Sequence, residues 1–79
     1  MKISIIGYGK MGQQIQKIAV ERGHEIHAVI DDDNWSQDSI LGSDVAIEFT
    51  QPESAKKNII NCFKANVPVV IFAVSKLGI

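Results

Sequence analysis

Glycines near the N-terminus are spaced for binding a phosphate group. An apolar run, Ile3–Ile6, leads into Gly7, Gly9 and Gly12 in the pattern Gly-x-Gly-x-x-Gly. In a dinucleotide site the first glycine makes the turn, the second lets a pyrophosphate approach the backbone, and the third lets a helix pack closely. Amides at the start of that helix would hold the phosphates. A glycine-rich turn that binds nothing is the alternative, and the apolar run before the motif and the amphipathic segment after it favour phosphate binding.

An acidic residue follows these glycines at the distance expected for a ribose ligand. Asp31 comes about 20 residues after Gly12, where a carboxylate accepts hydrogen bonds from the adenosine ribose. Its charge would repel a 2′-phosphate, and no Lys or Arg lies between Ile26 and Pro52. We therefore predict NAD(H) as the favoured cofactor. NADP(H) is kept as the second choice because Lys10 lies in the glycine turn, and a solvated loop carboxylate is the alternative for Asp31.

Other residues with suitable chemistry lack the partners that catalysis or metal binding requires. His24 and His27 straddle a predicted turn and strand with no third ligand nearby, so no metal site is predicted. Cys62 has no histidine placed as a base, and Glu48 is assigned no catalytic role. Residues 31–43 are predicted to be a polar connection between two strands. Trp35 within it is interpreted as a hydrophobic cover over the sheet edge, with stacking on an adenine as the alternative.

The elements that position these residues alternate between strand and helix. Mostly apolar runs predict strands over residues 2–6, 25–30, 44–49 and 67–74. One helix follows the glycines and ends at Gly23. A second helix starts at the capping box Thr50-Gln51-Pro52-Glu53 and runs to about Ala65, with Asn66 after it. The residues expected to face the sheet are Met11, Ile15, Ile18, Ala19, Ala55, Ile59, Ile60 and Phe63.

This β-α-β-β-α-β pattern predicts an α/β fold, a Rossmann-like parallel four-stranded sheet with helices on its faces. We expect strand order 2-1-3-4, with right-handed crossovers. The loops after Ile6 and Phe49 would then diverge at a topological switch point, where open α/β sheets bind ligands. Phe49 and Thr50 are expected beside the nicotinamide end of a dinucleotide. Helix capping by Thr50 alone is the alternative.

Composition narrows the function classes further. The 79 residues suffice for a single domain over 1–79, and the net charge of −1 gives no basis for binding nucleic acid or a membrane surface. No apolar run approaches the ~20 residues of a transmembrane helix. A single cysteine fits a reducing, cytoplasmic setting. The strand over 67–74 is apolar and expected at the sheet edge, so we predict a homo-oligomer through it.

Three segments together resemble one enzyme family. They are Ile5–Gly12 (IIGYGKMG), Ile47–Ala55 (IEFTQPESA) and Asn66–Val70 (NVPVV). From its first residue to about Val70 the chain resembles the N-terminal half of dihydrodipicolinate reductases, and the second segment is the most specific signature. Carried over by position, the implied cofactor-binding residues are Gly7, Tyr8, Gly9, Lys10, Met11 and Gly12 at the pyrophosphate, Asp31 at the adenosine ribose, and Phe49 and Thr50 by the nicotinamide.

The resemblance implies hydride transfer from NADH or NADPH to a cyclic dihydrodipicolinate-type substrate in lysine and diaminopimelate biosynthesis, by a homotetramer with a second, substrate-binding domain. Two family features are missing here. The family's Gly-Thr-Thr-Gly turn after the fourth strand is absent, and the chain there reads Ile71-Phe72-Ala73-Val74-Ser75-Lys76-Leu77-Gly78-Ile79. A downstream His-His-x-x-Lys-x-Asp segment does not occur. We therefore expect a truncated or frame-altered dinucleotide-binding domain that is not catalytic alone. A stand-alone NAD(H)-binding or sensing module and a non-binding assembly fragment are the alternatives.

Overall fold

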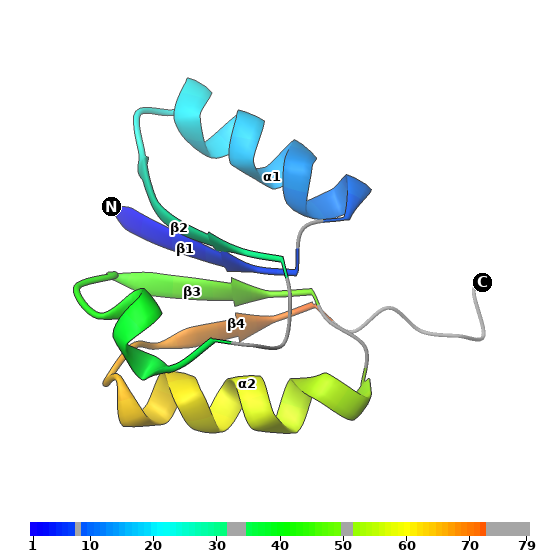
Figure 1. Ribbon diagram of the computed structural model, residues 1–79. Helices are drawn as coiled ribbons and strands as arrows, with labels where there is room; N and C mark the ends of the chain where they lie inside the picture. Colours follow the sequence, from blue (N-terminus) through cyan, green and yellow to red (C-terminus); the bar gives the residue numbers. More distant parts are fainter. Residues whose placement is uncertain (8, 32–34, 50–51, 73–79) are drawn as a thin grey trace.

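Strands and helices alternate along the chain in the computed structural model (Figure 1), which describes residues 1–7, 9–31, 35–49 and 52–72. In chain order the elements are β1 (Lys2–Ile6), α1 (Lys10–Glu21), β2 (Glu25–Ile30), the 3-10 helix η1 (Gln37–Ile40), β3 (Val45–Glu48), α2 (Pro52–Lys64) and β4 (Val69–Ile71). The predicted alternation is confirmed. The segment between β2 and β3 differs from the prediction, because it contains η1 as well as loop.

The strands form one parallel sheet in the order β2-β1-β3-β4, as predicted. β1 pairs with β2 on one side and with β3 on the other, and β4 pairs with β3. The chain leaves β1 toward β2 and later returns to the opposite side of β1 as β3. The loops that follow β1 and β3 therefore diverge at the carboxyl edge of the sheet, which creates the expected switch point.

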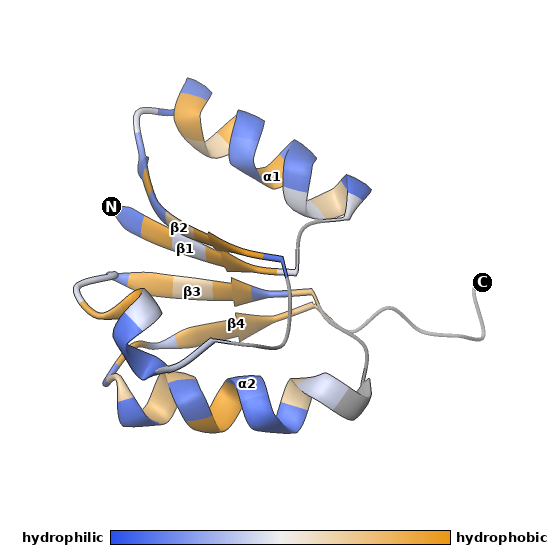
Figure 2. Cartoon of the chain, viewed as in Figure 1, coloured by the Kyte–Doolittle hydropathy of each residue, from blue (hydrophilic) through white to orange (hydrophobic). Residues whose placement is uncertain are grey.

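A helical layer covers each face of the sheet (Figure 1), with α1 on one face and α2 together with η1 on the other. Side chains alternate along β1, so Ile3 and Ile5 join a core with Ala19 of α1. Ile6 points to the opposite face and joins a core with Ile40 of η1. Figure 2 shows the strands as largely hydrophobic, whereas both helices mix hydrophobic and hydrophilic residues. Each helix is thus amphipathic and buries one side.

The ends of both helices match the sequence interpretation. Gly23 follows α1 with φ of 86°, and Asn66 follows α2 with φ of 58°. Both values lie in the left-handed region that terminates helices. The amide of Gly23 donates to the carbonyl of Val20, and that of Asn66 donates to the carbonyl of Phe63.

The predicted inward face of α1 is partly wrong. Met11 and Ile18 are 47% and 45% exposed, whereas Gly12 and Ala19 are buried. These two small residues lie seven positions apart on one side of the helix and bring its backbone close to the sheet. The larger side chains flank this line of contact and remain partly in solvent.

The predicted inward face of α2 is also partly wrong, because Ile60 and Phe63 are 43% and 69% exposed. Asn58 and Cys62 are buried in their place. The indole Nε1–H of Trp35 donates to Oδ1 of Asn58 at 3.0 Å, so a polar side chain is satisfied at a buried position. This hydrogen bond favours a rotation of α2 about its own axis that buries Asn58 and leaves Ile60 partly exposed. Hydrophobic periodicity alone does not predict this rotation.

The last strand of the described residues is shorter than expected. β4 covers Val69–Ile71 rather than residues 67–74, and residues 73 and 74 lie outside the described residues. Val67 instead packs as a buried residue of the core between the sheet and α2. Val70 and Ile71 are 47% and 50% exposed.

Candidate functional site

The glycine turn after β1 is tied to the neighbouring strand. Gly7 has φ of 94°, a conformation that L side chains rarely adopt, and its amide donates to the carbonyl of Ile30 at 2.8 Å. This bond joins the turn to the last residue of β2, which directly precedes Asp31. The backbone thus holds the glycine turn and the predicted ribose ligand next to each other.

The third glycine brings α1 into contact with the turn. A Cβ at Gly12 would lie 2.6 Å from the carbonyl oxygen of Gly7 and 3.6 Å from Cγ2 of Ile5. The first of these atoms is backbone, so it cannot move aside as a flexible side chain would. Gly12 is therefore required for the helix to start where it does, as the motif predicts.

The second glycine leaves open space at the helix start. Gly9 is the N-cap residue of α1 in an extended conformation, with φ of −79°, and a Cβ there would meet no atom within 4 Å. No side chain of the described residues caps this end, and the first turn contains no acidic residue. Lys10 instead adds a positive charge at the positive end of the helix dipole, where an anion is the favourable neighbour.

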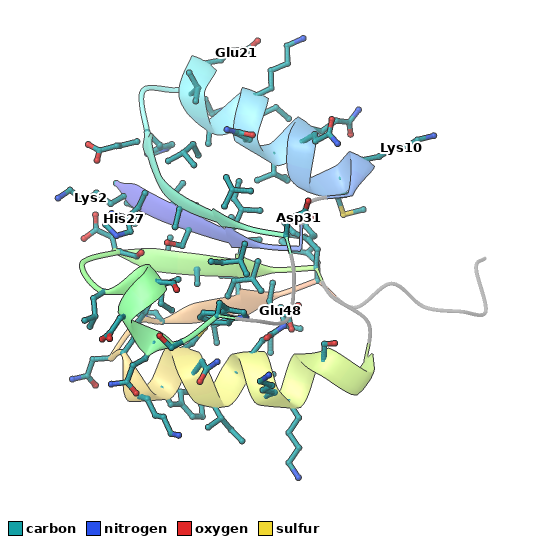
Figure 3. The ribbon with its side chains drawn as sticks, viewed as in Figure 1. Lys2, Lys10, Glu21, His27, Asp31 and Glu48 are labelled. Atoms are coloured by element: carbon teal, nitrogen blue, oxygen red, sulfur yellow. The ribbon has the colours of Figure 1, made fainter. Side chains whose placement is uncertain are left out.

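The predicted ribose ligand lies at the same edge of the sheet. Asp31 is exposed and directly follows β2. Figure 3 shows Asp31 at the carboxyl end of the sheet and Lys10 at the start of α1 on the same side of the molecule. The structure thus gathers the glycine turn, Lys10 and Asp31 around one end of the sheet.

An aromatic pair occupies the other side of the switch point. The amide of Phe49 donates to the carbonyl of Ile6 at 2.8 Å, and the amide of Phe72 donates to the carbonyl of Glu48 at 2.9 Å. The two rings stack with centroids 5.1 Å apart and an interplanar angle of 17°. Phe49 was predicted from the sequence, but Phe72 was not. Phe72 falls inside the strand predicted over residues 67–74, so its position directly after the shorter β4 is not evident from the sequence.

A buried polar group lies beneath this edge, on the α2 face. Glu48 is 1% exposed and Cys62 is fully buried. Burial, and secondarily the negative charge of Glu48, raise the pKa of the Cys62 thiol from 9.0 to about 11. The thiol is therefore protonated at neutral pH and acts as a packing residue rather than a nucleophile.

Some of the expected site residues need separate mention. Tyr8 and Thr50 lie outside the described residues.

The histidine that precedes β2 lies near the N-terminus of the chain. Nδ1 of His24 lies 3.4 Å from the amino group of Met1. Within the described ranges, no group of three or more His, Cys, Asp or Glu residues could hold a metal ion. No helix in the described part of the chain is long and apolar enough to cross a membrane.

Comparisons with known proteins agree on one family. A family model described as "Dihydrodipicolinate reductase, N-terminus" matches residues 1–73. A 4-hydroxy-tetrahydrodipicolinate reductase from Christiangramia forsetii is 46% identical over 71 residues, covering 89% of this chain and 30% of that protein. The same enzyme from Staphylococcus carnosus is 40% identical over 62 residues, covering 67% of this chain and 26% of that protein. The chain thus spans less than a third of the length of these relatives.

Proposed function

Because the chain belongs to the family of the dihydrodipicolinate reductase N-terminal domain, as its sequence motifs indicate, we propose that it binds a nicotinamide dinucleotide. The observation that carries the proposal is the glycine turn. Gly12 lies against the carbonyl of Gly7 too closely for any side chain, whereas the space beside Gly9 is open. The close contact at Gly12 holds the helix against the turn, and the open space at Gly9 leaves room for a pyrophosphate on the amides at the start of the helix.

Each part of the dinucleotide has a proposed partner. The pyrophosphate lies by Gly7, Tyr8, Gly9, Lys10, Met11 and Gly12, the adenosine ribose by Asp31, and the nicotinamide by Phe49 and Thr50. The exposed carboxylate of Asp31 supports a preference for NAD(H), because it can accept bonds from both ribose hydroxyls and repels a 2′-phosphate. Lys10 at the helix start is the group that would help to retain NADP(H).

We propose that the chain serves as the dinucleotide-binding part of a reductase and does not complete hydride transfer alone. Hydride transfer needs the acceptor held against the donor, and that positioning supplies much of the rate. The relatives named as reductases are more than three times as long as the part that this chain matches. A binding or sensing module without turnover, and an assembly fragment that binds no dinucleotide, are the competing functions.

A homo-oligomer through β4 is part of the proposal. β4 is an edge strand of the described sheet, and Val70 and Ile71 are about half exposed. Phe63 of α2 is 69% exposed and lines one surface hollow with Val67 and Pro68, which directly precede β4. An uncovered apolar edge strand favours pairing with another chain, and a second copy is always present in solution.

Calorimetric titration with NADH and NADPH tests the proposed function. Gly9→Val places a branched side chain in the open space that a pyrophosphate would use, and the extended backbone at Gly9 accommodates valine. We expect the variant to lose at least about tenfold in affinity, or 1.4 kcal/mol. Gln14→Val adds the same side chain to an exposed position later in α1 and should bind as the wild type does.

The titrations also separate the competing functions. Tighter binding of NADH than NADPH, with the difference reduced in Asp31→Asn, supports the role of Asp31. No binding of either dinucleotide by the wild type would leave the assembly fragment as the better account. Binding without turnover in a hydride-transfer assay with a dihydrodipicolinate-type substrate distinguishes a binding part from a complete enzyme.

A further inference from the structure

The stacked rings of Phe49 and Phe72 are held in place by the sheet. β3 and β4 pair in parallel register, with Ile47 opposite Val70 and Glu48 opposite Ile71. Phe49 and Phe72 therefore follow their strands at equivalent positions, and main-chain hydrogen bonds to Ile6 and Glu48 continue the ladder through both residues. Side chains on such rigid elements keep their positions better than those on free loops.

The two rings have different environments. Phe49 packs against the core formed by Ile3, Ile5 and Ala19, on the α1 face of the sheet. Phe72 stacks on Phe49 but is 44% exposed. The partly buried ring of Phe49 thus supports the more exposed ring of Phe72, which offers a flat apolar surface at the carboxyl edge of the sheet.

The position of this surface relative to the glycine turn indicates its ligand. The turn follows the central strand β1, Asp31 follows β2 on one side, and the two rings follow β3 and β4 on the other. A dinucleotide whose pyrophosphate lies at the turn and whose adenosine ribose lies at Asp31 must extend its other half toward β3 and β4. That half ends in a planar pyridine ring.

We propose that Phe72, supported by Phe49, is a specificity-determining residue that stacks on the nicotinamide ring. The proposal rests on the proposed dinucleotide function and goes beyond it, because it assigns to this chain an aromatic contact where the family resemblance implies a glycine turn. Offset stacking on a phenyl ring favours a flat aromatic partner. The positively charged pyridinium of NAD+ is also attracted by the negative face of the ring.

Titration of NAD+ and of ADP-ribose, which lacks the nicotinamide, tests this role. The wild type should bind NAD+ about 3- to 10-fold more tightly than ADP-ribose. Phe72→Leu removes the aromatic face but keeps an apolar side chain, and should lose this advantage while its affinity for ADP-ribose is unchanged. Ile60→Leu changes an exposed apolar side chain of α2 that has no proposed role, and should behave as the wild type does. Phe72→Trp, which keeps an aromatic face, should retain the advantage.

Each contrary outcome has a distinct meaning. Equal affinity for NAD+ and ADP-ribose in the wild type, or an advantage that survives in Phe72→Leu, would overturn the stacking role and leave the dinucleotide function intact. Tighter NAD+ binding by Phe72→Leu than by the wild type would overturn it too, because the ring would then obstruct the nicotinamide. A wild type that binds neither ligand would refute the dinucleotide function itself.

Discussion

Alanine at Gly12 should destabilise the domain, whereas alanine at Gly9 should leave its stability nearly unchanged. The two glycines belong to one motif and lie three residues apart, but their surroundings differ. A Cβ at Gly12 would lie 2.6 Å from the carbonyl oxygen of Gly7, and a Cβ at Gly9 would meet nothing within 4 Å. The same methyl group is therefore a clash at one position and a solvated substituent at the other.

The cost at Gly12 follows from what must move. The helix and the turn must separate by about 0.5 Å, and a tightly packed interior resists such shifts. The carbonyl of Gly7 cannot yield easily, because the amide of the same residue is bonded to Ile30 at 2.8 Å. Overpacking of this kind costs about 1–3 kcal/mol. The better helix propensity of alanine offsets roughly 0.5–1 kcal/mol. A clash with a backbone atom at 2.6 Å falls in the upper half of the overpacking range, about 2–3 kcal/mol, so we expect a net loss of about 1–2.5 kcal/mol.

The balance at Gly9 is different. Its φ of −79° suits alanine. Because alanine has less conformational freedom than glycine in the unfolded chain, the substitution favours folding by about 0.4–1 kcal/mol. Alanine is a poorer N-cap than glycine, which costs a similar amount. The free energy of unfolding should change by less than about 0.5 kcal/mol.

Urea unfolding measures both effects, and the single tryptophan provides the signal. Trp35 packs against the core on the α2 face and donates a hydrogen bond to Asn58, so its fluorescence reports loss of that packing. For Gly12→Ala we expect an unchanged m-value with a lower midpoint. Its Tm should fall by about 5–15 °C, since a domain of this size loses roughly 4–8 °C per kcal/mol. A Gly12→Ala protein as stable as the wild type, or equal destabilisation at both glycines, would refute the close contact between α1 and the turn.

Two further predictions concern the α2 face and the sheet edge. The free energy of unfolding should fall as the pH rises from 9.0 toward about 11, because the unfolded chain releases the Cys62 proton before the folded chain does. The urea midpoint should therefore fall less steeply with pH in Cys62→Ala than in the wild type. The same dependence on pH in both proteins would contradict the raised pKa. Ile71→Lys places a charge on the edge strand and should shift the protein toward monomer, as measured by light scattering and sedimentation. Lys17→Gln, at an exposed position of α1, should leave the oligomeric state unchanged. A wild type that is monomeric at high concentration would contradict self-association.

The sequence was sufficient to predict the order of the strands and the ends of the helices. These features depend on residues with strong local preferences. Gly7 and Gly23 adopt positive φ, and Asn66 does so after α2. Continuous apolar strands joined by crossovers then leave few arrangements of the sheet, and the observed order is the one predicted.

The rotation of the helices was less predictable because it depends on contacts between distant segments. Ile60 and Phe63 fit the apolar periodicity of α2, but Asn58 takes the buried position through its bond to Trp35. These partners are 23 residues apart, and Trp35 lies in the polar connection between β2 and β3. Pattern analysis within one helix cannot detect such a pair. The stack of Phe49 on Phe72 is non-local in the same way.

The proposed site depends on β1 as a common support for its two halves. The adenosine side is fixed because the turn after β1 bonds to Ile30, one residue before Asp31. The nicotinamide side is fixed because Phe49 bonds to Ile6, the last residue of β1. A perturbation of the turn should weaken the contact with the pyrophosphate, which NAD+ and ADP-ribose share, whereas a change at Phe72 should weaken only the contact with the nicotinamide, which ADP-ribose lacks. In Gly12→Ala the affinities for ADP-ribose and NAD+ should fall together, so the ratio that reports stacking on Phe72 should stay constant even where both affinities are lower.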